Sequence, residues 1–298
     1  MKRPRVALFG GGTMENKGAR VPLWIVASFL LFFGVLFDGA CDPLAVKPLR
    51  SMNDPFWSTS SAPRVGTIKG LVYSNPFSSE FCDRARLDLG GNRLLSRWFM
   101  AAAIPVPPAD SSERTRKELL YLLAIAKRRN PEYLAAIDQT KQFDWRLIAL
   151  PVLGDNLAPK TGTMIEAARL EMLQVVTQLK DYYKRTRPTV LESSLTTVVP
   201  VPDSSSYPSG HGSMSFVVAF LLEEIVPEKA NELERRAFVY GWLRELAGIH
   251  YPSDLSNGVL LARQIADQLL VTPTFAQLVE ESRAEILALQ HAPLAQAQ

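Results

Sequence analysis

Apolar residues recur at spacings of three and four along much of the chain, which is the pattern of amphipathic helices. The clearest stripe is Ile165, Ala168, Met172, Val175, Leu179 and Tyr182. The pattern predicts helices at Asn92–Ala103, Ser111–Arg129, Pro131–Gln139, Thr163–Lys184, Ser213–Val226, Ala230–Gly248, Ser253–Leu270 and Thr274–Leu289. It indicates the helices themselves and leaves their arrangement open.

The first 40 residues have the pattern of a targeting segment. Lys17 and Arg20 precede an apolar run over residues 21–36, which is followed by small residues at 39 and 40. A run of roughly 16 residues is shorter than the about 20 that a bilayer span needs. We therefore expect a secretory signal peptide, with Met14 as an alternative start, and a periplasmic or secreted bacterial protein. An uncleaved membrane anchor is the alternative.

The chain has two cysteines, Cys41 and Cys82. Cys41 directly follows Ala40, as in a lipidated protein, although Asp38 stands where a lipobox would carry an apolar residue. An oxidising exported compartment would instead permit a disulfide between the two cysteines. The sequence leaves both readings open.

Composition and charge bound the rest of the chain. With 298 residues, of which 47% are hydrophobic, it is long enough to bury a sizeable core. Residues 41–80 read as an extended arm or linker, 81–290 as one helical domain and 291–298 as a flexible tail. No later run is apolar and long enough for a stable membrane span once the leader is removed. The 33 Lys and Arg and the 30 Asp and Glu are interspersed, so nucleic acid is not an expected partner. Nothing indicates the oligomeric state.

Lys180 and Arg187 are the first candidate binding residues. They lie seven residues apart, about two helical turns, so we expect both to project from one face at the end of a long helix that Pro188 terminates. Further along, a loop rich in turn residues meets an apolar helix at Ser209, Gly210 and His211. A helix N-terminus with exposed backbone N–H groups favours an anion. Two simpler readings remain: a solvated helix face, and a serine N-cap beside a surface histidine.

Arg244, His250 and Asp254 form the last candidate group. Arg244 interrupts an apolar stripe, and a buried guanidinium needs an anionic partner. The stripe is Leu233, Ala237, Tyr240, Arg244 and Ala247. Asp254 would accept a proton from one nitrogen of His250 and leave the other free to attack, unless the pair is only a capping contact. The third histidine, His291, lies in an Ala- and Gln-rich tail and is expected to be solvated.

Together these spacings resemble the type 2 phosphatidic acid phosphatase superfamily, whose signature is K-x6-R-P, P-S-G-H and S-R-x5-H-x3-D. Here the three parts are Lys180-x6-Arg187-Pro188, Pro208-Ser209-Gly210-His211 and Leu243-Arg244-x5-His250-x3-Asp254. The segment Ile104-Pro105-Val106-Pro107-Pro108-Ala109-Asp110-Ser111 resembles the exported branch called class A bacterial non-specific acid phosphatases. The resemblance covers about Pro105 to Leu270. Leu243 departs from it, since the family pattern has Ser there.

The resemblance implies an all-α helical bundle and an acid phosphatase that acts on small phosphorylated substrates without a metal or other cofactor. His250 would be the nucleophile that forms a phosphohistidine, Asp254 would orient it, and His211 would protonate the leaving oxygen. Phosphate would be bound by Lys180, Arg187, Ser209, Gly210 and Arg244. Catalysis would require His250 to be neutral while His211 is protonated. Residues 193–207 and the segment before Lys180 are the expected walls of the substrate pocket, where specificity would arise.

Two other functions are compatible with the same residues. A vanadium-dependent haloperoxidase would bind vanadate where a phosphatase binds phosphate. A catalytically impaired, phosphate-binding helical protein is the second alternative, and it is prompted by Leu243.

Overall fold

The computed structural model describes residues 42–52, 104–154 and 159–291 of the chain. Within these ranges the fold is all-α and contains no strand, as expected. The helices are α3 (Glu113–Ala126), α4 (Pro131–Gln139), α5 (Arg146–Leu153), α6 (Pro159–Tyr183), α7 (Pro188–Leu191), α8 (Gly210–Glu223), α9 (Ala230–Leu246), α10 (Pro252–Leu270) and α11 (Pro273–His291), with a short 3-10 turn at Pro227–Lys229. Seven of the eight predicted helices correspond to α3, α4, α6, α8, α9, α10 and α11, and α4 matches residue for residue. The eighth, at Asn92–Ala103, lies outside the described ranges.

The helix starts follow local sequence signals. Ser112 caps α3 by accepting from the Thr115 amide at 3.1 Å, and Asn130 caps α4 by accepting from the Tyr133 amide at 2.8 Å. Prolines occupy the first positions of α4 and α10, where a missing N–H costs nothing. The sequence analysis did not predict α5 and α7. Pro151 lies inside α5, and α7 has only four residues, so neither shows a clear periodic pattern.

The long helix predicted over residues 163–184 is α6, but the prediction that it continues to Pro188 is wrong. It ends at Tyr183, and Lys184 has a positive φ of 51°. The chain is then extended up to Arg187, which is the N-cap of α7 with Pro188 as its first residue. Pro188 therefore begins a helix, and Lys180 and Arg187 do not share a helix face.

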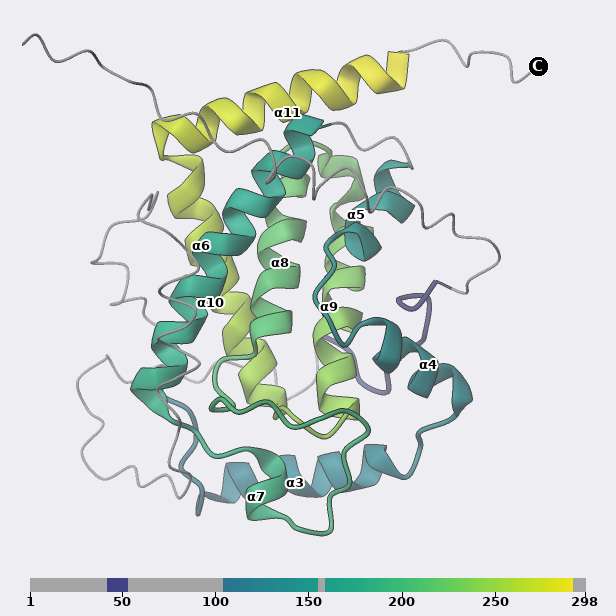
Figure 1. The fold of residues 1–298 in the computed structure, drawn as a ribbon, viewed down its shortest axis with the longest axis vertical. Helices are drawn as coiled ribbons and strands as arrows, with labels where there is room; N and C mark the ends of the chain where they lie inside the picture. The colour runs from purple at the N-terminus through teal and green to yellow at the C-terminus, as the bar shows by residue number, and fades with distance from the viewer. Residues whose placement is uncertain (1–41, 53–103, 155–158, 292–298) are drawn as a thin grey trace, which may run out of the picture. The chain divides into compact units, whose positions relative to one another are not determined.

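Helix α8 is the centre of the packing. Its residues from 212 to 222 are all buried, and it packs against α6, α9 and α10 (Figure 1). A Cβ at Gly212 of α8 or at Gly241 of α9 would lie 2.4 or 2.3 Å from Cδ1 of Leu255 on α10. The two glycines therefore allow α8, α9 and α10 to meet closely around Leu255. These are the helices that carry or adjoin His211, Arg244 and Asp254.

Residues 42–52 have no helix and contact α9 and α4. Leu44 and Val46 are buried, and the Asp42 carboxylate accepts from Arg236 at 2.7 Å. Arg50 donates from Nε to the buried Glu245 at 2.9 Å. The predicted leader, the two cysteines, the rest of the predicted arm and the predicted helix at Asn92–Ala103 lie outside the described residues.

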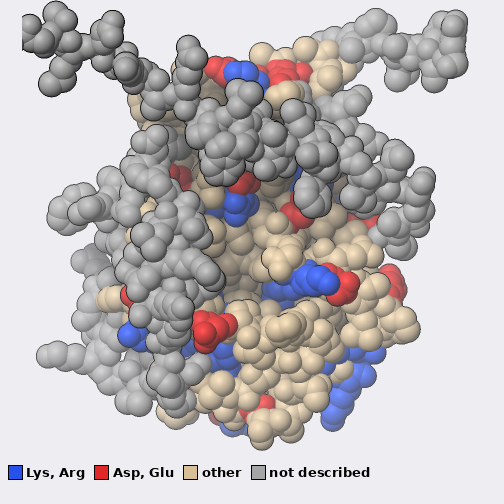
Figure 2. Space-filling view, viewed as in Figure 1, with Lys and Arg blue, Asp and Glu red and all other residues tan. Residues whose placement is uncertain are grey.

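The surface of the described part shows charges of both signs dispersed among other residues on the face in Figure 2. Within the described ranges, no helix combines the length and hydropathy needed to cross a membrane.

Candidate active site

The eight site residues predicted from the sequence come from five helices and their connections. Lys180 lies in the last turn of α6, Arg187 precedes α7, and Arg244 lies in the last turn of α9. Ser209, Gly210 and His211 form the start of α8, while His250 and Asp254 flank the start of α10. The fold brings these ends of the helices together.

His250 and Asp254 form a direct hydrogen-bonded pair. Nδ1 of His250 lies 3.0 Å from Oδ2 of Asp254, and both side chains are buried. Because a carboxylate can only accept, Nδ1 carries the proton and Nε2 has the lone pair. Asp254 also accepts from the Tyr251 amide at 3.0 Å, so the capping contact considered above exists alongside the pair.

The Nε2 atom of His250 faces Arg187. Nη1 of Arg187 lies 3.1 Å from Nε2 and donates to the Ile249 carbonyl at 2.7 Å. The same guanidinium donates from Nε to the Ser204 carbonyl at 2.8 Å. Among the described residues Arg187 forms no ion pair, and its burial lowers the pKa of the guanidinium to about 10.

Burial and positive charge act together on His250. Burial is the larger cause, and the Arg187 and Lys180 charges add to it, so that the pKa of His250 falls to about 3 even though Asp254 opposes the change. The imidazole is therefore neutral throughout the range in which an ordinary histidine titrates. A neutral, oriented imidazole with a directed lone pair is a competent nucleophile.

Asp254 is fully buried and surrounded by donors. Oδ1 accepts from Arg185 at 2.6 Å, and Oδ2 also accepts from the Ser206 hydroxyl. Burial alone would raise the pKa of Asp254, but the Arg185 charge and the His250 hydrogen bond outweigh it and hold that pKa well below its usual range. The carboxylate is therefore ionised across the pH range in which histidines titrate.

Lys180 connects α6 to the segment before α8. Its Nζ donates to the carbonyls of Ser205 and Ser206 at 2.7 and 3.0 Å, and the Ser205 hydroxyl donates back to the Lys180 carbonyl at 2.7 Å. The side chain is 5% exposed. Residues 204–206, part of the predicted specificity wall, are thus held beside Arg187 and Asp254.

Arg244 is buried, as its place in the apolar stripe predicted. Nη2 donates to the Thr140 hydroxyl at 2.5 Å and the Ile137 carbonyl at 3.2 Å, and its Nε has no hydrogen-bond partner among the described residues. No ion pair with a described carboxylate accompanies it, and burial lowers the pKa of Arg244 to about 10. A buried guanidinium with an unused donor and no carboxylate is suited to a bound anion.

His211 lies in the first turn of α8 between two aromatic rings. Its ring is 6.1 Å from that of Phe143 and 5.9 Å from that of Tyr240, centroid to centroid. Its buried Nε2 has no partner among the described residues. Burial first, then the neighbouring Arg244 and His250, lower the pKa of His211 well below its ordinary value, although a hydrogen bond from the His211 ring to the Lys141 backbone opposes this.

The lowered pKa values favour the neutral form of both imidazoles, which differs from the expected split between a neutral His250 and a protonated His211. The main cause is burial, to which the neighbouring positive charges add. A phosphate bearing two negative charges beside His211 would raise its pKa, because an opposite charge favours the protonated form. The ligand, rather than the protein alone, would supply the split.

Ser209 and Gly210 contribute mainly backbone geometry here. The Ser209 hydroxyl caps α8 by accepting from the Gly212 amide at 3.3 Å, and its own amide donates to the Asp254 carbonyl at 3.0 Å. A Cβ at Gly210 would make only an ordinary contact, 3.7 Å from Val176. The serine N-cap reading therefore holds for this structure, and the helix N-terminus beside it is where an anion is favoured.

Sequence reasoning missed Glu118, Arg185 and Ser206, all of which contact Asp254 or its partners. One signal was present. On α3 the buried positions are Thr115, Glu118, Leu122 and Ile125, so a carboxylate occupies an apolar stripe. Arg185 carried no such signal, because it follows the end of a helix in a basic run. Within the described residues no group of three or more His, Cys, Asp or Glu side chains is placed to hold a metal ion.

Comparison with known proteins agrees with this geometry. The family model described as "PAP2 superfamily" matches residues 164–271, a range that contains all eight predicted site residues. A non-specific acid phosphatase of Salmonella typhi is 29% identical over 197 residues, which cover 61% of this chain and 78% of the relative. The non-specific acid phosphatase of Salmonella typhimurium matches with the same values. An acid phosphatase of Zymomonas mobilis is 32% identical over 81 residues, or 27% of this chain and 31% of the relative.

Proposed function

Because the chain has a PAP2 superfamily domain and is homologous to bacterial non-specific acid phosphatases, we propose that it is an exported acid phosphatase that hydrolyses small phosphate monoesters through a phosphohistidine. One observation carries the proposal. The Nε2 lone pair of His250 is directed, by a buried Asp254, toward a guanidinium that has no ion pair among the described residues.

In the first step, Nε2 of His250 attacks phosphorus, and the bond from phosphorus to the ester oxygen breaks. The leaving oxygen takes a proton from His211, which the bound phosphate has made more basic. Asp254 keeps its hydrogen bond to Nδ1 and stabilises the positive charge that develops on the His250 ring. The products are the alcohol and a phosphorylated His250.

In the second step, His211 takes a proton from water and the hydroxide attacks phosphorus. The bond from phosphorus to Nε2 breaks, which returns His250 to its neutral form and releases inorganic phosphate. Arg187, Arg244 and Lys180 would bind the non-bridging oxygens, whose charge is distributed over them in the transition state. His211 thus regains from water the proton that it gave to the leaving oxygen.

Hydrolysis of an aryl phosphate from about pH 4 to 8 with EDTA present tests the proposal, because histidines titrate across this range. Wild type should turn over, His250→Ala should show no measurable turnover, and Asp254→Asn should retain on the order of 10⁻⁴ of the rate, as when a carboxylate that orients a catalytic histidine is neutralised. His291→Ala is the matched control and should equal wild type. Turnover by the His250→Ala variant, or inhibition of wild type by EDTA, would contradict the mechanism.

The intermediate and the export are tested separately. An acid-labile phosphate on a His250-containing peptide after rapid quenching would identify the phosphohistidine. N-terminal sequencing of the protein recovered from the periplasm and the medium would give the cleavage site of the leader.

A further inference from the structure

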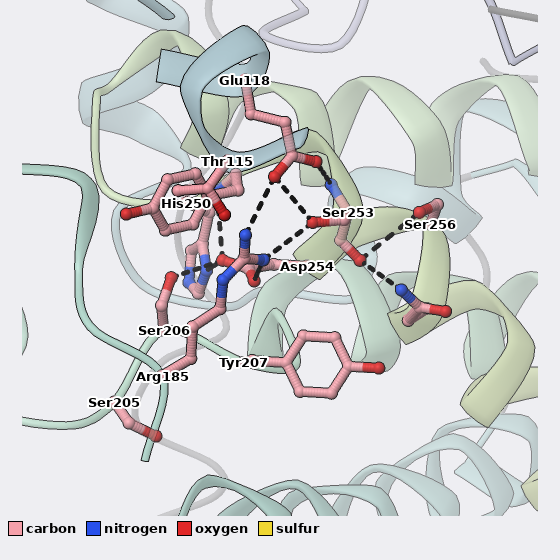
Figure 3. A network of polar contacts seen from close by, with 12 residues as sticks. Thr115, Glu118, Arg185, Ser205, Ser206, Tyr207, His250, Ser253, Asp254 and Ser256 are labelled. Carbon is pink, nitrogen blue, oxygen red and sulfur yellow. Dashed lines mark hydrogen bonds and ion pairs between the residues drawn. The ribbon is translucent and has the colours of Figure 1, made fainter. Parts of the chain in front are cut away.

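We propose that Arg185 and Glu118 are positioning residues of this phosphatase: a buried chain from Glu118 through Arg185 and Asp254 to His250 fixes the charge of Asp254 and, through it, the tautomer of the nucleophile (Figure 3). The inference rests on the proposed function. Neither residue belongs to the signature through which the chain was assigned to its family.

Arg185 connects two carboxylates. Its Nη1 donates to Oδ1 of Asp254 at 2.6 Å and to the Ser253 hydroxyl at 2.7 Å, while its Nη2 donates to Oε2 of Glu118 at 2.9 Å. The guanidinium carbon lies 3.9 Å from the centre of the Tyr251 ring. A planar group held at both ends and stacked on one face has one orientation, which a lysine cannot reproduce.

Glu118 fixes the far end of this chain and the start of α10. It projects from α3 and accepts from the Ser253 amide at 2.8 Å and the Ser253 hydroxyl at 2.9 Å. Ser253 is the residue before Asp254, and both are fully buried. Because α3 lies outside the range matched by the family model, the family assignment does not cover this contact.

Both carboxylate oxygens of Asp254 accept hydrogen bonds. Oδ1 receives Arg185, and Oδ2 receives His250, Ser206 and the Tyr251 amide. The carboxylate therefore cannot rotate away from Nδ1 of His250. As long as Asp254 is ionised, the proton of the neutral imidazole stays on Nδ1 and the lone pair stays on Nε2.

The positive charge of Arg185 keeps the buried Asp254 ionised. Burial alone would raise the pKa of Asp254, and Arg185 is the largest cause acting in the other direction. Burial opposes the charged form of Arg185 too, yet Asp254 and Glu118 together raise its pKa. The titratable and charged groups acting on or near Asp254 are Arg185, Arg187, His250, Tyr251, Glu118 and Glu245.

Loss of Arg185 would leave a desolvated carboxylate beside two further acidic groups. Its proton affinity would rise, and a protonated Asp254 would no longer be an obligatory acceptor for Nδ1–H. His250 would then populate the tautomer that carries its proton on Nε2, which cannot attack phosphorus. As the pH falls, kcat/KM of such a variant would therefore decrease at a higher pH than in wild type.

The test compares wild type with Arg185→Met, Arg185→Lys and Glu118→Gln in the pH dependence of kcat/KM for an aryl phosphate. Arg185→Met should move the acid limb upward by about 1 to 3 pH units, the range over which a neighbouring opposite charge lowers a carboxyl pKa. Arg185→Lys keeps the charge and should move it less. Glu118→Gln removes a like charge, so it should lower the rate without an upward shift. Arg116→Met, at an exposed ion pair of α3, is the control.

A double-mutant cycle with Asp254→Asn separates positioning from general stability. If Arg185 acts through Asp254, replacing it should change kcat little in the Asp254→Asn background, although it changes kcat strongly in wild type. The inhibition constant of vanadate should stay within about threefold in Arg185→Lys, because Arg185 does not bind the oxyanion. ¹⁵N NMR of the histidines should show proton on Nδ1 of His250 in wild type and a mixture in Arg185→Met.

An unshifted acid limb in both Arg185 variants, or equal losses in the two backgrounds of the cycle, would overturn the inference. Where Arg185→Met does not fold by circular dichroism, the other two variants decide, because the acid limb should shift upward in Arg185→Lys and should not shift upward in Glu118→Gln. Failure of the proposed function gives a different result, since wild type itself would not hydrolyse the substrate.

Discussion

Arg187 places Nη1 3.1 Å from Nε2 of His250, so the lone pair proposed to attack phosphorus faces a buried cation. A phosphoryl group bound there would accept the hydrogen bond from Nη1 of Arg187. Nε2 of His250 would then be free to attack. The Arg187 charge also lowers the pKa of His250 and so favours the neutral imidazole.

Replacing Arg187 with Lys tests this relationship. Lysine keeps the charge but cannot contact Ser204, Ile249 and a phosphate oxygen together. A hydrogen bond to a charged group contributes about 1.5–3 kcal/mol, so we expect vanadate to inhibit about 10- to 150-fold more weakly. The inhibition constant measures this. An unchanged constant would exclude Arg187 from oxyanion binding.

Leu243 gives a second prediction, because it stands where the family pattern has Ser. Leu243 is fully buried in the core. Leu243→Ser should not improve activity. It should lower the free energy of unfolding by about 2–5 kcal/mol, as do large-to-small core substitutions, while kcat/KM of the folded protein changes little.

Thr140→Val is compared with Leu243→Ser, because it should affect phosphate binding rather than stability. It conserves volume but removes the hydroxyl that accepts from Arg244 at 2.5 Å. It should weaken phosphate binding more than it lowers stability. Urea unfolding and inhibition by phosphate separate the two effects, and a gain of activity in Leu243→Ser would contradict the first prediction.

The titration of His250 predicts how stability depends on pH. Its pKa is about 3 in the folded protein and near 6.5 when exposed. Below pH 6.5 the unfolded state binds a proton that the folded state does not, so stability should fall as pH falls from about 6.5 toward 3, by about 1.4 kcal/mol per pH unit for this one group.

Thermal unfolding across that window measures the effect. His250→Gln should show a shallower pH dependence of Tm than wild type, and His291→Gln should match wild type. Phosphate should raise Tm more at acidic pH, because a bound anion raises the pKa of both buried histidines. A parallel pH dependence of wild type and His250→Gln would disprove the assignment.

Arg50 and Glu245 test whether residues 42–52 are part of the folded domain. Both side chains are buried, and burial raises the pKa of Glu245 even though Arg50 opposes it. Arg50→Met would leave the Glu245 charge without its partner, and we expect a loss of about 3–5 kcal/mol at pH 7.

The loss in Arg50→Met should become smaller at lower pH, where the unpaired Glu245 takes up a proton. The exposed pair of Arg116 and Glu113 is the control. Breaking it should cost at most about 1 kcal/mol by urea unfolding. A loss in Arg50→Met no larger than the control would show that the arm contact contributes little.

The sequence alone determined the features that depend on spacing and composition. Apolar periodicity located most of the helices, and the three-part signature pointed to the PAP2 superfamily, whose family model matches residues 164–271. The apolar stripe around Arg244 also predicted its burial, because a helix face is fixed by the period of 3.6 residues.

Only the tertiary structure decided how these parts face one another. The spacing of Lys180 and Arg187 predicted that both lie on one helix. In the structure the helix ends at Tyr183, and Arg187 contacts His250. Glu118 and Arg185 are 67 residues apart, and no local pattern links residues whose contact depends on how separate helices pack. The charge of Asp254 and the neutrality of both histidines follow from that packing, since burial and neighbouring charge exist only in the folded chain.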